Sequence, residues 1–308
     1  MFKYIMRRLF ISIAVIFIIA TTTFWMCRAV PGGPFDREKP LNPTIIENLN
    51  KKYHLDKPVF EQYIDYMVDV AKFDFGPSYF YKNETVNDYI DRCFPVSFIL
   101  GIFAMIVAIS LGIPAGIISA LKQNKWQDNI LKVLTTILVS LPNFVIASGL
   151  MYFLGYKLRI LPVAMWGTPQ QAVMPVLALA AYPLSYITKM MKSSMLEVLN
   201  NDYIRTARSK GVPRGKLIYK HALKNAILPV ITVLGPMFAG IITGSLVVEK
   251  IFTIPGLGQQ FTAAITNRDY TMIMGLTIFY SSLLIVSILI VDILYAVIDP
   301  RIKLSEGA

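Results

Sequence analysis

The sequence contains little of what a soluble enzyme of its length uses. Charged residues occupy 16% of the 308 positions, against about a quarter in ordinary soluble domains, and 55% of the residues are hydrophobic. This balance indicates that lipid, not water, surrounds most of the chain. The two cysteines, Cys27 and Cys93, form no CxxC pair and have no zinc-ligand spacing, so neither a disulfide framework nor a metal site is predicted.

Motifs for catalysis and for energy conversion are also missing. The sequence has no GxxxxGK[ST] loop and no HExxH motif, and its two histidines, His54 and His221, fall outside the apolar runs. An ion-coupled carrier would need a series of ionisable groups within the membrane. Lys189 and Glu249 lie at the ends of apolar runs, and we expect only Asp292 to be buried. The sequence therefore predicts a chain that is not an enzyme, has no cofactor, and takes its energy from another polypeptide.

What the sequence does contain is long apolar runs. A helix needs about 20 apolar residues to cross a bilayer. Six stretches reach that length: 9–29, 95–121, 130–155, 172–191, 226–248 and 271–298. They lack the alternating polarity of barrel strands, and helices satisfy the backbone hydrogen bonds within lipid. The first run is too long for a signal-peptide core and is expected to be retained. We expect an all-α integral membrane protein with six transmembrane helices.

The positive charge of +11 indicates the orientation of these helices. With six spans, both termini lie on one side, together with the loops around 122–132 and 192–225. These four segments contain sixteen Lys and Arg residues and five acidic residues, whereas the loop 31–94 contains eight basic and eleven acidic residues. We therefore expect both termini in the cytoplasm, and a nucleic-acid partner is not needed to explain the charge.

The loop 31–94 is expected to fold into a small, mainly helical extracytoplasmic insertion between the first two spans. A Pro-Gly-Gly-Pro segment at 31–34 precedes a predicted helix near 43–54. A second stretch, 59–70, places Val59, Tyr63, Tyr66, Met67 and Val70 at helical spacing. These apolar faces predict a helical cap that packs on the ends of the spans; direct contact with solute is the alternative.

The loop 192–225 carries the most informative pattern. Gly211 suits the left-handed residue that follows a helix end, and Pro213 suits the first turn of a new helix. The pattern predicts two short helices in a stiff hairpin held at both ends by membrane spans. A partner that grips such a hairpin can move the spans. The alternative is a basic amphipathic loop lying on anionic lipid headgroups.

The residues 203–211, YIRTARSKG, followed by His221-Ala222-Leu223, resemble the coupling loop of peptide-class permeases of ABC importers. The general consensus of that family begins Glu-Ala-Ala and has a glycine four residues after the last alanine. Ala207 and Gly211 keep this spacing, whereas Arg205 stands at the position of the glutamate.

Further blocks resemble the same family. The segment 248–258, VEKIFTIPGLG, is similar to the outer segment after the fifth span of dipeptide, oligopeptide and nickel permeases. Its Pro-Gly-Leu-Gly interrupts a helix, which favours a gate or a docking surface over a plain turn. Blocks of the outer loop, such as residues 31–35 and 73–78, resemble the first ("B") permease subunit of oligopeptide systems.

The resemblance implies the type I permease fold of ABC importers, with four segments: residues 1–30 (cytoplasmic tip and first span), 31–94 (extracytoplasmic subdomain), 94–299 (permease core) and 300–308 (cytoplasmic tail). It implies a multi-pass protein of the cytoplasmic membrane that contacts lipid. The implied partners are a second homologous permease subunit, two cytoplasmic ATP-binding subunits and an extracytoplasmic peptide-binding protein. A dipeptide or nickel permease and an ion-coupled peptide carrier are the alternatives.

The resemblance also implies two functional segments. The residues expected to contact the ATPase are Arg205, Thr206, Ala207, Arg208, Lys210, Gly211, Pro213, Arg214 and Lys216. The residues expected at the outer gate or facing the receptor are Glu249, Phe252, Pro255, Gly256 and Gly258.

Overall fold

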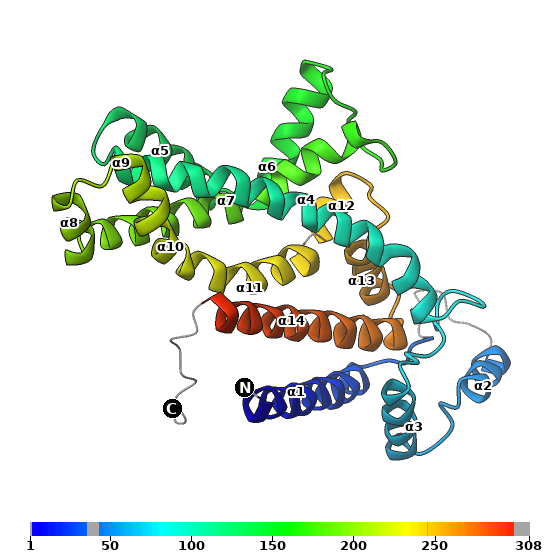
Figure 1. The fold of residues 1–308 in the computed structure, drawn as a ribbon. Coiled ribbons are helices and arrows are strands. Elements are labelled where there is room, and N and C mark those ends of the chain that lie inside the picture. Colours follow the sequence, from blue (N-terminus) through cyan, green and yellow to red (C-terminus); the bar gives the residue numbers. More distant parts are fainter. Residues whose placement is uncertain (1, 36–42, 245, 299–308) are drawn as a thin grey trace. The chain divides into compact units, whose positions relative to one another are not determined.

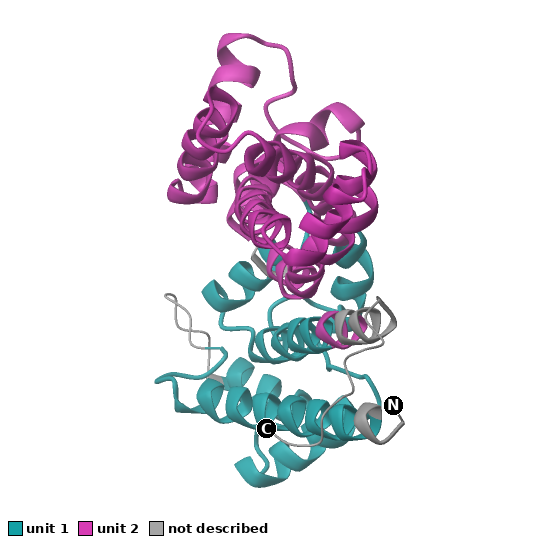
Figure 2. Ribbon diagram, turned by 60° about the vertical axis from the view of Figure 1, so that its left-hand side comes forward, with its two compact units in different colours: residues 1–96, 255–285 teal, residues 97–254, 286–308 magenta. Residues whose placement is uncertain are grey.

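The computed structural model describes residues 2–35, 43–244 and 246–298 (Figure 1). The chain divides into two compact units, which Figure 2 colours separately. Unit 1 comprises residues 1–96 and 255–285, and unit 2 comprises residues 97–254 and 286–308. The described ranges consist of helices and connecting turns, with a single isolated β-bridge between Pro77 and Thr85. The expected all-α class is confirmed.

Five helical segments of the described chain are long and apolar enough to cross a membrane. They are α1 (Phe2–Ala29), α4 (Val86–Leu121), α7 (Pro169–Leu199), α11 (Leu228–Gly244) with α12 (Leu246–Ile251), and α14 (Tyr270–Ile298). Five of the six expected spans therefore correspond to long helices. Pro175 and Pro183 lie within α7, as expected of a helix whose neighbours compensate for the lost backbone bonds.

The expected third span is not one continuous helix. It consists of α5 (Trp126–Ser140), α6 (Asn143–Leu150) and the π-helix η1 (Met151–Lys157), and the chain bends by 106° between α5 and α6. Pro142 has no backbone N–H and disfavours the helical conformation at Leu141, which is extended at φ −87° and ψ 128°. The expectation of an unbroken helix over 130–155 is wrong, and six spans are reached only when this bent pair counts as one.

Unit 1 contains the two helices predicted for the loop 31–94. These are α2 (Pro43–Lys52) and α3 (Val59–Ala71). Tyr66, Met67 and Val70 of α3 pack against a buried cluster that includes Phe75 and Val86. The same cluster includes side chains of α13 (Leu257–Thr266) and of the first half of α14. The predicted helical cap is thus confirmed, except that Val59 remains exposed.

A buried carboxylate holds the loop after α3 to the start of α14. Asp269 is fully buried and accepts hydrogen bonds from the hydroxyl groups of Ser78 and Thr271 and from the backbone N–H of Tyr79. A buried carboxylate is tolerated only when donors surround it in this way. Asp269 therefore fixes the loop at residues 78–80 within unit 1.

In unit 2, α4 and α7 approach closely at glycine positions. A Cβ atom at Gly116 of α4 would lie 2.6 Å from Cβ of Met191 and 2.7 Å from the carbonyl oxygen of Thr188, both on α7. Distances this short leave room for glycine only. The small residues of the second apolar run therefore serve helix packing, as expected for membrane helices.

Asp128 joins three helices of unit 2. Its carboxylate is fully buried and accepts hydrogen bonds from the Ser119 hydroxyl on α4 and from the backbone N–H of Asn124. It also pairs with Nζ of Lys192 on α7 and, at 3.0 Å, with Nζ of Lys132 on α5. We call these side chains the Asp128 cluster.

Glu249 of α12 is also fully buried, and the Ser97 hydroxyl of α4 donates a hydrogen bond of 2.8 Å to it. The expectation that Asp292 alone would be buried is therefore wrong, because the helix end that carries Glu249 packs inside unit 2. The side chain of Asp292 lies outside the described residues.

The close contact at Gly116 leads to a stability prediction. In Gly116→Ala, the new methyl group overlaps backbone as well as side-chain atoms, at a cost of about 1–3 kcal/mol, whereas alanine regains about 1 kcal/mol of helix propensity. We expect a lower unfolding midpoint for the purified chain in detergent micelles, followed by circular dichroism. Gly149→Ala in α6 is the matched control, because no atom lies within 4 Å of its Cβ position. An unchanged midpoint for Gly116→Ala would contradict the packing.

Candidate functional site

The loop 192–225 folds as the sequence predicts, into short helices on either side of Gly211 and Pro213. After α7 ends at Leu199, the chain forms α8 (Asp202–Ser209), α9 (Arg214–Lys216), the π-helix η2 (Leu217–Ala222) and α10 (Leu223–Ala226). We call residues 200–226 the bracket. Its helices are too short to be stable alone, so packing against the rest of unit 2 holds them.

The turn of the bracket is a defined helix-ending motif. Gly211 has φ +78°, a conformation that costs a glycine little and other residues more. Its N–H donates to the carbonyl of Arg208, and the N–H of Val212 donates to the carbonyl of Ala207. This pair of bonds is a Schellman motif. It explains the spacing of Ala207 and Gly211, since these positions supply the acceptor and the left-handed residue.

One face of the bracket anchors it and the other is exposed. Ile204, Leu217 and Ala222 are buried, and the Asn225 amide donates to the Tyr203 hydroxyl. The nine residues expected to contact an ATPase lie together on this bracket, and all except the half-buried Ala207 are exposed. Five of them are cationic: Arg205, Arg208, Lys210, Arg214 and Lys216. The exposed Arg205 lies 3.6 Å from Asp202, a pair that contributes little in water.

The bracket continues directly from a helix that is held by the Asp128 cluster. Lys192 lies about two turns before the end of α7 and pairs with the buried Asp128. Sequence reasoning treated both residues only as charges of cytoplasmic loops. The available signal was the i,i+4 spacing of Asp128 and Lys132, which by itself indicates a weak surface pair.

The outer segment interrupts its helix as expected, and its residues differ in exposure. In unit 2, α12 ends at Ile251, Thr253 adopts φ +54°, and the N–H of Ile254 donates to the carbonyl of Glu249. Phe252 is buried, and its carbonyl accepts from the N–H of Met165. Figure 1 places α12 and α8 toward opposite ends of unit 2.

The remaining residues of the outer segment belong to unit 1. Pro255 is exposed, Gly256 precedes α13, and both Gly256 and Gly258 are buried. The structure therefore leaves only Pro255 accessible among the five residues expected at the outer gate.

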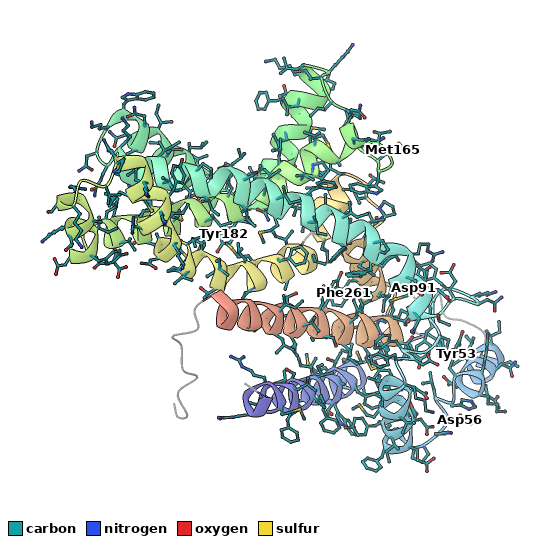
Figure 3. The ribbon with its side chains drawn as sticks, in the orientation of Figure 1. Tyr53, Asp56, Asp91, Met165, Tyr182 and Phe261 are labelled. Carbon is teal, nitrogen blue, oxygen red and sulfur yellow. The ribbon has the colours of Figure 1, made fainter. Side chains whose placement is uncertain are left out.

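Unit 2 also has an apolar groove between α7 and α11, with a volume of about 470 Å³. Tyr182, labelled in Figure 3, and Tyr186 lie on its α7 side and are partly exposed. Pro183 and Pro236 interrupt the hydrogen bonding of the two helices, because proline has no N–H for the carbonyl four residues earlier. Those carbonyls belong to Leu179 and Thr232, and both residues line the groove.

Within residues 2–35, 43–244 and 246–298, no group of three or more His, Cys, Asp or Glu side chains could hold a metal ion. Unit 2 combines an exposed cationic bracket, helices joined by the buried Asp128 cluster, and an apolar groove.

Comparison with known proteins gives consistent matches over the full chain. Residues 112–304 match the family described as "Binding-protein-dependent transport system inner membrane component", and residues 1–101 match its N-terminal companion family. The dipeptide transport system permease protein DppB of Bacillus subtilis is 45% identical, covering 99% of both chains. The oligopeptide transport system permease protein OppB of Escherichia coli is 44% identical, covering 98% of this chain and all of the relative.

A solved structure supports the fold. The inward-facing MetNI methionine ABC transporter matches with a TM-score of 0.53 and 14% identity, over 68% of this chain and 96% of the matched chain. This likeness confirms the type I permease fold of ABC importers. Together with the family match and the full-length relatives, it establishes that the chain belongs to the family of inner-membrane components of binding-protein-dependent transport systems.

Proposed function

We propose that this chain is the membrane subunit through which an ATP-driven importer passes oligopeptides. The observation that carries the proposal is the bracket, a rigid cationic hairpin continuous with α7 in a chain that has no phosphate-binding loop. The names of the full-length relatives, which include oligopeptide and dipeptide permeases, support a peptide as the solute. Dipeptides are the alternative solute, since one dipeptide permease is as similar to this chain as the oligopeptide permeases are.

Besides this chain, the proposed assembly contains three kinds of subunit. A second, homologous permease completes the passage, two cytoplasmic ATP-binding subunits supply energy, and an extracytoplasmic protein delivers the peptide. The five exposed cations of the bracket suit an acidic surface on an ATP-binding subunit. When ATP draws the two ATP-binding subunits together, each would pull its bracket and move the attached helices as rigid bodies.

The bracket proposal is tested at its turn. Gly211→Val places a β-branched residue at φ +78°, which strains the Schellman motif by about 1–3 kcal/mol. We expect the peptide transported per ATP hydrolysed to fall about tenfold in reconstituted vesicles, with normal amounts of protein in the membrane. Gly215→Val is the matched control, because Gly215 lies four residues away with open space at its Cβ position and no positive φ. Normal transport by Gly211→Val would remove the support for coupling through this hairpin.

We also propose that the groove between α7 and α11 forms this chain's wall of the passage. The carbonyl of Thr232, which loses its helical donor at Pro236, is the acceptor proposed for peptide N–H groups, which every peptide has regardless of its side chains. The aromatic rings of Tyr182 and Tyr186 supply a sequence-tolerant apolar surface. Such a lining suits an importer that accepts many peptide sequences.

The groove proposal predicts protection by substrate. In Tyr182→Cys, a thiol reagent is expected to label the groove and block uptake, and excess peptide is expected to slow labelling. Tyr156→Cys, at a tyrosine that is 69% exposed and lies outside the groove, is the control and should show no protection. Equal labelling of Tyr182→Cys with and without peptide would argue against the passage wall.

The proposed orientation places both termini and the bracket in the cytoplasm and residues 31–94 on the extracytoplasmic side of the membrane. A membrane-impermeant maleimide applied to whole cells should label Lys51→Cys in α2 and leave Lys216→Cys in α9 unlabelled until the membrane is opened. Both sites are exposed, whereas the native Cys27 and Cys93 are buried and contribute little background. Labelling of Lys216→Cys in intact cells would reverse the orientation.

A further inference from the structure

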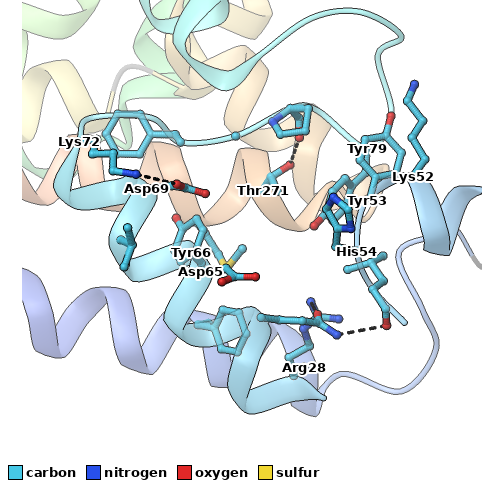
Figure 4. A pocket seen from close by; sticks show the side chains of 18 residues that line it. Arg28, Lys52, Tyr53, His54, Asp65, Tyr66, Asp69, Lys72, Tyr79 and Thr271 are labelled. Atoms are coloured by element: carbon cyan, nitrogen blue, oxygen red, sulfur yellow. Dashed lines mark hydrogen bonds and ion pairs between the residues drawn. The ribbon is translucent and has the colours of Figure 1, made fainter. Parts of the chain in front are cut away.

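Unit 1 contains a second cavity, separate from the groove of unit 2. It has a volume of about 440 Å³, within the range of small-molecule sites. Its walls come from the end of α1, the turn after α2, the length of α3 and the start of α14 (Figure 4). Nothing in the coupling and passage proposals uses this cavity.

The side chains around the cavity have an excess of positive charge. Its two acidic residues are each paired, Asp65 with Lys57 at 2.6 Å and Asp69 with Lys72 at 3.9 Å. Arg28 and Lys52 also line the cavity, and neither has a carboxylate partner in the described part of the chain. Once the pairs are counted, Arg28 and Lys52 remain without a carboxylate partner in the described ranges, and Figure 4 shows them on different walls of the cavity.

Arg28 is held in place by neutral groups. Its guanidinium donates to Oε1 of Gln62 and lies 5.4 Å from the centre of the Phe24 ring. The amide nitrogen of Gln62 donates to the carbonyls of Leu55 and Lys57, which turns the amide oxygen toward Arg28. A guanidinium has five N–H donors arranged to bind a carboxylate with two parallel bonds. The contact with Gln62 leaves most of these donors available.

Tyr66 and Tyr79 add no negative charge to the cavity wall. Burial raises the pKa of Tyr66 well above its usual value and raises the pKa of Tyr79 to about 12. Both side chains are therefore neutral at physiological pH and do not compete with an anionic ligand for Arg28.

Aromatic rings form the rest of the cavity wall. Phe24 stacks with Tyr66 at 6.1 Å, and the rings of Tyr53 and Tyr79 lie 4.9 Å apart. A ligand that fits therefore has an anionic end for Arg28 and a body that tolerates apolar walls.

We propose that this cavity is a binding site for the terminal carboxylate of a short peptide. The choice of a peptide rests on the proposed function; the anion chemistry rests on Arg28, which lines the cavity and has no carboxylate partner in the described part of the chain. The phosphate of a lipid headgroup carries the same kind of oxyanion, so the experiment separates the two sources.

The test measures equilibrium binding of radiolabelled tri-alanine and of its C-terminal amide to the purified full-length chain in phosphatidylcholine nanodiscs. We expect the free acid to bind at least about tenfold more tightly than the amide, the size expected when hydrogen bonds to a charged group are lost. Arg28→Gln should abolish that preference, and Arg28→Lys should restore part of it. Equal binding of acid and amide to the unmodified chain would overturn the proposal.

The last part of the test measures competition between labelled tri-alanine and compounds that carry a phosphate. If phosphatidylglycerol in the nanodiscs, or inorganic phosphate, displaces the labelled tri-alanine as well as unlabelled tri-alanine does, the site belongs to a phosphate and the peptide assignment is wrong. No ATP-binding subunit is present in these measurements. A negative result in these binding measurements therefore does not contradict the coupling proposal. Likewise, normal uptake by Gly211→Val would not contradict the proposed binding site.

Discussion

The hydrogen bonds and ion pairs of the Asp128 carboxylate are the interactions on which the bracket end of unit 2 depends. A buried charge requires partners, and the partners here come from α4, the turn after it, α5 and α7. Because one carboxylate satisfies them all, these segments cannot shift separately without leaving a charge unpaired. The bracket begins shortly after Lys192 of α7. It is therefore attached to a base, the segments joined by the Asp128 cluster, that moves as one piece.

Under the proposed coupling, this base is the part of unit 2 that transmits force from the bracket to the groove. A force on the exposed face of the bracket reaches α7 through continuous backbone, and Tyr182 and Tyr186 of the groove lie on that same helix. Motion of α7 therefore changes the groove directly. The tight contact at Gly116 carries the motion to α4, because helices that meet this closely move together.

Sequence patterns predicted the features that depend on local chemistry. The lengths of the apolar runs predicted the membrane helices. Gly211 and Pro213 predicted the turn of the bracket, because glycine tolerates positive φ and proline fixes φ near the value of a first helical turn. Features that depend on distant residues were missed. Nothing near Asp128 or Glu249 in the sequence identifies Lys192 or Ser97 as partners, so both acids were expected to be exposed.

The break between α5 and α6 shows a different limit. Pro142 was visible within the third apolar run, yet Pro175 and Pro183 lie in an unbroken α7. Proline alone therefore does not decide whether a helix continues; the neighbours that compensate for its missing bond do. Those neighbours are known only from the fold.

The turn of the bracket has a consequence for how such transporters diverge. Its hydrogen bonds involve only backbone atoms and require one residue without a side chain, so the number of residues between Ala207 and Gly211 is constrained while the outward side chains are not. Arg205 occupies one of the unconstrained positions. Under the proposed coupling, a bracket of this kind would adapt to a different ATP-binding subunit through substitutions of its exposed charged side chains, while the length of the turn stays the same.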